Sequence, residues 1–174
     1  EVSLAIVAGA VLAAVLLAVP ATRTLMGDRV LNIAGGSARI RILIWSGIRD
    51  ITTASGWRVW LGHGPETLRH VFPVHYVPEI GRIEGTEAMP DRAHNELLDT
   101  LVSAGAIGVA LELAVFAAVI VCAFRVKDRT LRAGLLAAAV AHILEIQLGL
   151  ATVPSRLAFI AAAAVIAAST PRPL

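Results

Sequence analysis

A histidine followed by an asparagine stands where a long apolar segment begins, and this pair is the first candidate for chemistry. His94 and Asn95 precede the mostly apolar residues 97–124. Asn95 is a favourable N-cap for a following helix, and the acids Glu96 and Asp99 suit the positive end of that helix. A neutral imidazole there can accept a proton from a hydroxyl group. The pattern predicts a general base at the boundary between water and membrane, although a histidine that only caps or anchors the helix fits the spacing equally well.

Three arginines upstream form the second candidate group. Arg39, Arg41 and Arg49 lie in a segment whose apolar residues recur at helical spacing, which predicts an amphipathic helix from an N-cap at Ser37 to about residue 53. A guanidinium group keeps its charge and binds phosphate through two parallel hydrogen bonds. These side chains are therefore candidates for binding a lipid diphosphate. Simple attraction to anionic lipid headgroups is the alternative.

Metal-dependent chemistry is not predicted. His63, His75 and His94 match no zinc-binding spacing, the chain has no HExxH pattern, and the region between the first two apolar segments has no DxD pair. We therefore expect no metal and no cofactor.

Further polar and small residues lie inside the apolar segments. Glu112, His142 and Glu145 could form a proton relay, but His142 and Glu145 are three residues apart and could instead satisfy each other. Gly105 and Gly108 would allow another helix to approach closely, so we expect them to serve packing.

The elements that position these side chains are predicted to lie in a membrane. Hydrophobic residues make up 57% of the 174 residues, which leaves too little polar surface for a water-soluble domain of this size. The net charge of +2 is dispersed without a basic stripe, so nucleic acid is excluded as a partner. The single cysteine, Cys122, allows no intrachain disulfide. Without an initiator methionine or a basic stretch before the first apolar segment, the chain is expected to be the back part of a larger membrane protein.

Four apolar segments predict about four transmembrane helices. They cover residues 2–19, 97–124, 133–150 and 157–168, of which the last is short. The fold class is therefore an all-α integral membrane protein with a large polar loop at about residues 20–95.

Charge and turn signals orient this loop and divide it. Residues 125–132 carry four basic side chains and one acid, which places them in the cytoplasm and the large loop outside. Within the loop we expect the amphipathic helix described above, a glycine-rich turn at residues 62–65 followed by a short helical stretch, and irregular structure at residues 73–90.

Several of these residues together resemble the O-antigen ligase family, which includes O-antigen polymerases and membrane oligosaccharyltransferases. The strongest element is His94-Asn95 followed, after nine residues, by the GAIG sequence of residues 105–108. Arg41 with Trp45 four residues later, and the sequence LGHGPETL at residues 61–68, resemble two further family elements. The similarity covers about residues 37–160.

The resemblance implies a function and a location. The chain would be the C-terminal part, residues 1–174, of a GT-C-like enzyme in the bacterial inner membrane, with its active loop facing the periplasm or exterior. Such an enzyme transfers a glycan from an undecaprenyl diphosphate carrier to an acceptor hydroxyl, without metal and with inversion. His94 would be the general base, Arg39, Arg41 and Arg49 would hold the diphosphate, and Asn95 would bind substrate or hold the start of the helix.

Other readings stay open. A ligase uses a glycan on a lipid as acceptor, whereas a polymerase uses a second carrier-linked chain, and a protein oligosaccharyltransferase is a third member of the class. From a different class, the chain could be a non-catalytic scaffold or transporter segment whose loop only contacts lipid.

Overall fold

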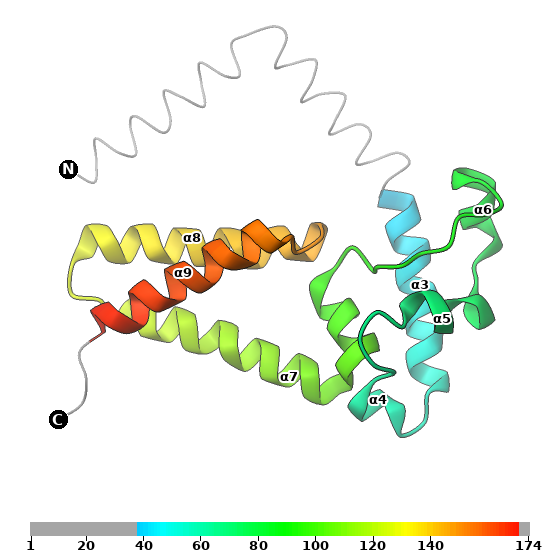
Figure 1. Cartoon of the computed structure of the whole chain (residues 1–174), viewed down its shortest axis with the longest axis horizontal. Coiled ribbons are helices and arrows are strands. Elements are labelled where there is room, and N and C mark those ends of the chain that lie inside the picture. The colour runs from blue at the N-terminus through cyan, green and yellow to red at the C-terminus, as the bar shows by residue number, and fades with distance from the viewer. Residues whose placement is uncertain (1–37, 171–174) are drawn as a thin grey trace, which may run out of the picture. The chain divides into compact units, whose positions relative to one another are not determined.

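The computed structural model of the chain describes residues 38–170, and all regular structure in this part is helical (Figure 1). The chain divides into two compact units, Glu1–Ile42 and Leu43–Leu174. The first unit is described only over residues 38–42. The apolar segment predicted at residues 2–19 and the predicted N-cap Ser37 lie outside the described residues. The elements are α3 (Ala38–Ala54), α4 (Arg58–Leu61), α5 (Leu68–Val71), the 3-10 helix η2 (Phe72–His75), α6 (Pro78–Glu84), α7 (Glu96–Phe124), α8 (Arg129–Leu148) and α9 (Val153–Ser169).

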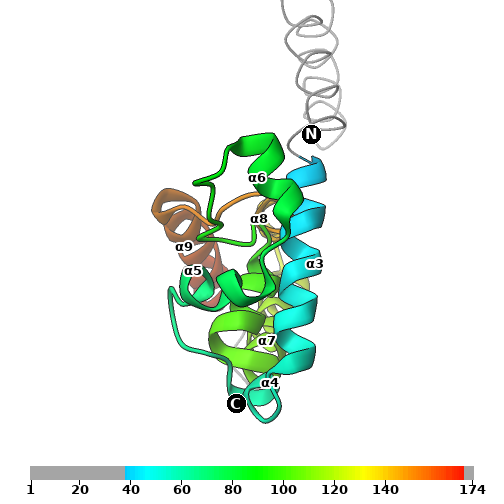
Figure 2. The same ribbon diagram turned by 90° about the vertical axis from the view of Figure 1, so that its right-hand side faces the viewer.

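Residues 43–95 form a small helical head around α3. The predicted amphipathic helix is confirmed, and Ile48 on its apolar face is fully buried, as are Phe72 and Ile80. Gly47 is required at the contact, because a Cβ there would lie 2.7 Å from Cε2 of Phe72. Figure 2 shows α4 near the C-terminal end of α3, and α4 packs on α7. A hydrogen bond from Trp45 Nε1 to the Ala93 carbonyl holds the loop before α7 against α3.

The prediction of irregular structure at residues 73–90 is wrong over about half of that range. The 3-10 helix η2 continues to His75, and α6 occupies Pro78–Glu84. Pro78 suits the first turn of a helix because its ring fixes φ and the missing N–H would have no partner there. Gly85 ends α6 with a φ of 107°, a backbone conformation that favours glycine. The proline and glycine that suggested a loop are therefore the start and stop signals of a short helix.

Helices α7, α8 and α9 pack together, and each runs antiparallel to the one before it (Figure 1). We call these three helices the hairpin. Helices α7 and α8 are long and apolar enough to cross a membrane, and α9 is a shorter apolar helix of 17 residues. The three apolar helices predicted after residue 95 are confirmed. Of these, α7 and α8 are long enough to span a membrane, and α9 is shorter. Large apolar side chains point outward along the hairpin, among them Leu111, Leu144 and Leu157, each about 60% exposed. Such a surface suits a lipid environment.

The two ends of α7 differ in character. Its N-terminal end adjoins the helical head, and its C-terminal end leads into the basic connection to α8, where Asp128 caps α8 by accepting a hydrogen bond from the Leu131 amide at 2.8 Å. A small apolar core of Ala123, Val126, Leu135 and Ile166 closes the hairpin at this second end. The basic segment predicted to be cytoplasmic and the helical head therefore lie at opposite ends of α7.

Candidate functional site

A break in α7 is the structural centre of the candidate site. Gly105 has φ 67° and ψ −169°, which divides α7 into a short first part and a long second part. The Trp60 backbone lies directly against this glycine, so that a Cβ on Gly105 would overlap the Trp60 carbonyl group. The close approach expected at Gly105 is confirmed, but the approaching segment is the end of α4 rather than another spanning helix.

The glycine-rich turn after α4 satisfies the backbone groups that the break exposes. The amides of His63 and Gly64 donate to the carbonyl oxygens of Val102 and Ser103, at 2.8 and 2.9 Å. Gly62 makes this possible, since a Cβ at its φ of 76° would overlap the Ser103 carbonyl. A buried carbonyl left without a donor would be costly, so the turn and the break stabilise each other. The sequence elements LGHGP and GAIG thus meet in space.

The residues around His94 are fixed through their backbones. Ala93 is fully buried, its carbonyl accepts from Trp45 Nε1 at 2.8 Å, and its amide donates to Asp99 Oδ1 at 2.8 Å. Asn95 caps α7 by accepting from the Leu98 amide at 3.0 Å, which confirms the predicted cap. His94 lies between these two anchors with a φ of 54°, a value that few residues other than glycine adopt. An unusual backbone conformation held from both sides is typical of functional positions.

Asn95 also links two elements of the hairpin. Its Nδ2 donates to the carbonyl oxygen of Gln147 near the end of α8, at 3.0 Å. The Asn95 side chain therefore uses its oxygen on α7 and its amide nitrogen on α8. These bonds fit the predicted role of holding the start of the helix.

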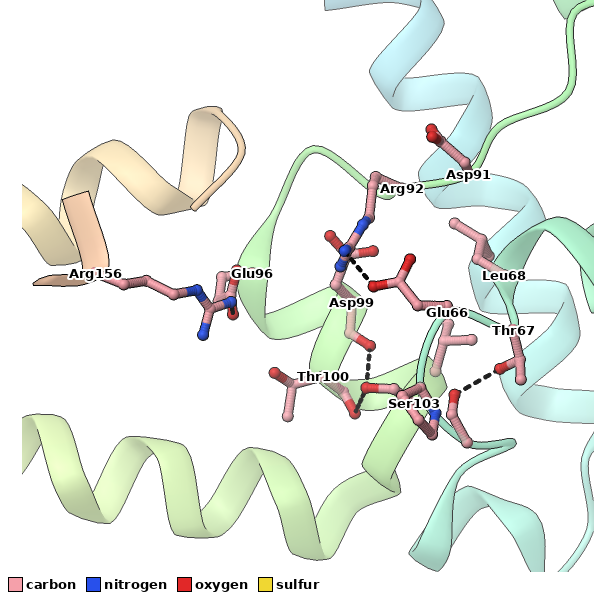
Figure 3. A pocket seen from close by; sticks show the side chains of 13 residues that line it. Glu66, Thr67, Leu68, Asp91, Arg92, Glu96, Asp99, Thr100, Ser103 and Arg156 are labelled. Atoms are coloured by element: carbon pink, nitrogen blue, oxygen red, sulfur yellow. Dashed lines mark hydrogen bonds and ion pairs between the residues drawn. The ribbon is translucent and has the colours of Figure 1, made fainter. Parts of the chain in front are cut away.

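A polar cavity of about 240 Å³ lies beside this anchored segment (Figure 3). Its walls come from the turn after Gly64, the residues before His94, the first part of α7 and the start of α9. The charged residues that line it are Glu66, Asp91, Arg92, Glu96, Asp99 and Arg156. His94 itself does not line the cavity, but Arg92 and Glu96, two residues before and after it, do.

Two ion pairs cross the cavity. Arg92 binds Glu66 and thereby connects the segment before His94 to the glycine-rich turn, as Figure 3 shows. Arg156 binds Glu96 and connects α9 to the first turn of α7. Because carboxylates outnumber guanidinium groups among the lining residues and both arginines are paired, the cavity favours a neutral, hydroxyl-rich ligand over a free phosphate.

The arginines predicted to hold a diphosphate are not part of this cavity. Arg39 and Arg41 lie in the first turns of α3, within the unit that ends at residue 42. Arg49 lies further along α3, where its exposed side chain pairs with Asp50 at 3.0 Å. The described structure therefore brings Asn95 and His94 next to the cavity and leaves Arg49 at a separate surface.

A second, more apolar cavity of about 220 Å³ lies between the three helices of the hairpin. It shares Glu96 and Arg156 with the polar cavity and includes Glu112, whose Oε2 is buried without a hydrogen-bond partner among the described residues. His142 lines it as well, stacks on Phe159 with ring centroids 4.7 Å apart, and has its Nδ1 3.8 Å from Oε2 of Glu145. His142 and Glu145 are thus close to each other, as mutual pairing would require.

The remaining histidines of the head form no metal site. Within residues 38–170, no group of three histidine, cysteine or acidic side chains is placed to bind a metal ion. His63 instead has its Nε2 2.8 Å from the Ser55 hydroxyl. Burial lowers the pKa of His63 below its ordinary value of 6.5, and the charge of Arg58 lowers it further. His63 thus serves the packing of the glycine-rich turn.

Sequence reasoning missed the ion-paired residues of the polar cavity. Arg92 stands two positions before His94 and was visible as a charge in the same stretch, but its partner Glu66 is 26 residues away. Arg156 and Glu96 are separated by 60 residues. Helical periodicity relates only residues within a few turns, so it gives no signal for either pair.

Comparisons with known proteins add no assignment. No family model matches the chain, and neither a curated protein nor a solved structure does.

Proposed function

We propose that the chain is the C-terminal part of a bacterial inner-membrane glycosyltransferase of the O-antigen ligase type. It transfers a glycan from undecaprenyl diphosphate to an acceptor hydroxyl, without metal and with inversion at the anomeric carbon. The observation that carries the proposal is the anchored backbone of His94, held between Ala93 and Asn95 beside a polar cavity at the start of a helix able to cross a membrane.

His94 is the general base in this proposal. Its imidazole takes the proton of the acceptor hydroxyl while the hydroxyl oxygen attacks the anomeric carbon, and the bond from that carbon to the carrier diphosphate breaks. A general base must come within hydrogen-bond reach of its substrate, and the bonds of Ala93 and Asn95 fix the backbone on either side of His94. The attack from the face opposite to the leaving group inverts the anomeric carbon.

The acceptor and the carrier diphosphate meet at the anomeric carbon but call for different side chains. The paired, net-acidic polar cavity suits the hydroxyl groups of an acceptor sugar and disfavours a diphosphate. The departing diphosphate gains negative charge that fixed cations must stabilise, and the resemblance of the sequence to the O-antigen ligase family assigns this role to Arg39, Arg41 and Arg49. Asn95 holds the first turn of α7 beneath the acceptor.

The orientation follows from the ends of α7. Its basic end, at residues 125–132, faces the cytoplasm by the positive-inside tendency, so the helical head with His94 faces the periplasm or exterior. Multi-pass insertion in the inner membrane places the head where a lipid-linked donor presents its glycan.

Polymerase activity is the nearest alternative, because a second carrier-linked glycan could present its hydroxyl to the same cavity. A non-catalytic scaffold or transporter segment is the alternative from another class. We favour an enzyme because the backbone on both sides of His94 is fixed beside a polar cavity.

Glycan transfer in cells tests the proposal. The full-length protein, with His94→Ala or Arg41→Ala, is expressed in a strain that lacks its own ligase, and lipopolysaccharide is stained for long chains. We expect the wild type to restore the high-mass ladder and both variants to lose it at normal membrane levels. A remaining single-repeat band would indicate a polymerase. A ladder unchanged in both variants would contradict catalysis by this loop.

A further inference from the structure

The short helix α4 presents an apolar, aromatic surface to its surroundings. Trp57, Trp60 and Leu61 are 64, 60 and 58% exposed, and α4 contains no buried residue. The guanidinium of Arg58 lies 5.0 Å from the centre of the Trp57 ring. Burying such side chains in water-excluding surroundings is strongly favourable, so their exposure points to a partner.

The position of α4 along the hairpin identifies that partner. The second part of α7, residues 106–124, extends about 28 Å at roughly 1.5 Å per residue, which matches the roughly 30 Å hydrocarbon layer of a bilayer. This part begins beside Gly105, the residue against which the Trp60 backbone lies. Figure 1 shows α4 next to the bend of α7. The tryptophans therefore lie beside the start of a helical segment that is long enough to cross the hydrocarbon layer.

We infer that α4 is an interfacial anchor that enters the headgroup layer of the outer leaflet. Trp57, Trp60 and Leu61 place their apolar surfaces among the lipid glycerol and upper acyl groups, and Arg58 pairs with lipid phosphate. Tryptophan suits this layer because its ring is apolar and its indole N–H seeks a polar partner. This inference rests on the membrane placement of the proposed function.

Two observations favour lipid over a protein partner. The long part of α7, which begins beside α4, also carries exposed apolar side chains, among them Ile107 and Leu111. Trp45, in contrast, donates its indole N–H to the Ala93 carbonyl and is engaged within the head. Trp57 and Trp60, which lie at α4, are instead exposed.

The anchor has a consequence for the site. Because the turn after α4 is bonded to Val102 and Ser103, the depth of α4 in the membrane sets the depth of the helix break and of the polar cavity beside it. A carrier diphosphate lies in the same headgroup layer. The anchor thus keeps the site at the height of its lipid-linked donor.

Quenching of tryptophan fluorescence by brominated lipid tests this inference. The full chain is reconstituted in vesicles of phosphatidylcholine with or without bromine at carbons 6 and 7 of one acyl chain. The matched control is Trp57→Phe/Trp60→Phe, which keeps the apolar character of α4 and leaves Trp45 in place. We expect the wild type to lose a large fraction of its emission in brominated vesicles, and the control to lose a clearly smaller fraction.

Two results would overturn the anchor. One is an equal fractional loss in the wild type and the control, and the other is a wild type that brominated lipid leaves unquenched while aqueous iodide quenches it. Neither readout requires a glycan donor. Failure of the anchor is therefore distinguishable from failure of the proposed transferase activity, which the His94→Ala ladder tests.

Discussion

Trp60 and Gly105 lie in direct backbone contact, so that α4 and the break in α7 form one interlocked structure. The contact needs the absence of a side chain at Gly105 and a φ of 67° that favours glycine. It joins the glycine-rich turn, the start of the long apolar helix and the segment that carries His94. The stability of the candidate site therefore depends on this glycine.

Gly105→Ala should destabilise the protein by about 1–3 kcal/mol, because the new methyl group overlaps the Trp60 carbonyl and the backbone conformation is strained for alanine. Gly134→Ala is the matched control. No atom lies within 4 Å of the Cβ position at Gly134 in α8, so alanine there should be neutral or stabilising by up to about 1 kcal/mol. Thermal unfolding in detergent measures both, and equal melting temperatures for the two variants would contradict the interlocked contact.

Replacements at Asn95 should separate its two bonds. Asn95→Ala loses the cap of α7 and the bond to Gln147, and should cost about 1–2 kcal/mol. Asn95→Asp keeps an oxygen for the Leu98 amide but loses the donor to the Gln147 carbonyl, so it should cost less. If unfolding shows Asn95→Asp to be as destabilising as Asn95→Ala, the cap is not the main contribution.

The two ion pairs of the polar cavity should differ in strength. In the Arg156 and Glu96 pair the Glu96 side chain is only 12% exposed, whereas in the Arg92 and Glu66 pair both partners are at least 40% exposed. Double-mutant cycles with Arg→Gln and Glu→Gln should give a coupling on the order of 1 kcal/mol for the first pair and under about 0.5 kcal/mol for the second. The reverse order would show that solvent screening does not govern these pairs.

His63 should make the stability of the head depend on pH. Its pKa is lowered in the folded state, first by burial and then by Arg58, so the unfolded chain binds more protons in the window below 6.5. The stabilising contribution is present above 6.5 and is lost as the pH falls through the lowered pKa of the folded state. His63→Gln should therefore flatten the fall in melting temperature on acidification, and an unchanged slope would show that other groups cause it.

Local patterns predicted much of the fold. The apolar spacing placed α3 within one residue of its end at Ala54, and the three later apolar segments correspond to α7, α8 and α9. Helix α6 was missed because Pro78 and Gly85, read as loop signals, are its first and last boundary residues. The cap at Asn95 was predictable because capping involves residues only three apart.

The candidate site was only partly predictable, for a different reason. His94 and Asn95 stand out by type and position, but the cavity beside them depends on contacts across 26 and 60 residues. The role of Gly105 depends on the path of the turn after α4, and a sequence pattern records the glycine without its neighbour. Local spacing therefore indicated the candidate residue and left its surroundings open.

The rate of glycan transfer by His94→Ala tests the central claim most directly. The full-length protein is reconstituted in liposomes with an undecaprenyl diphosphate-linked donor and an acceptor glycan, and initial rates are compared with those of the wild type and of His70→Ala. His70 is an exposed histidine of the same head outside the polar cavity, so its variant should keep the wild-type rate. We predict that His94→Ala lowers the rate by a factor of about 100 or more. Transfer by His94→Ala at the rate of His70→Ala would contradict the assignment of the general base.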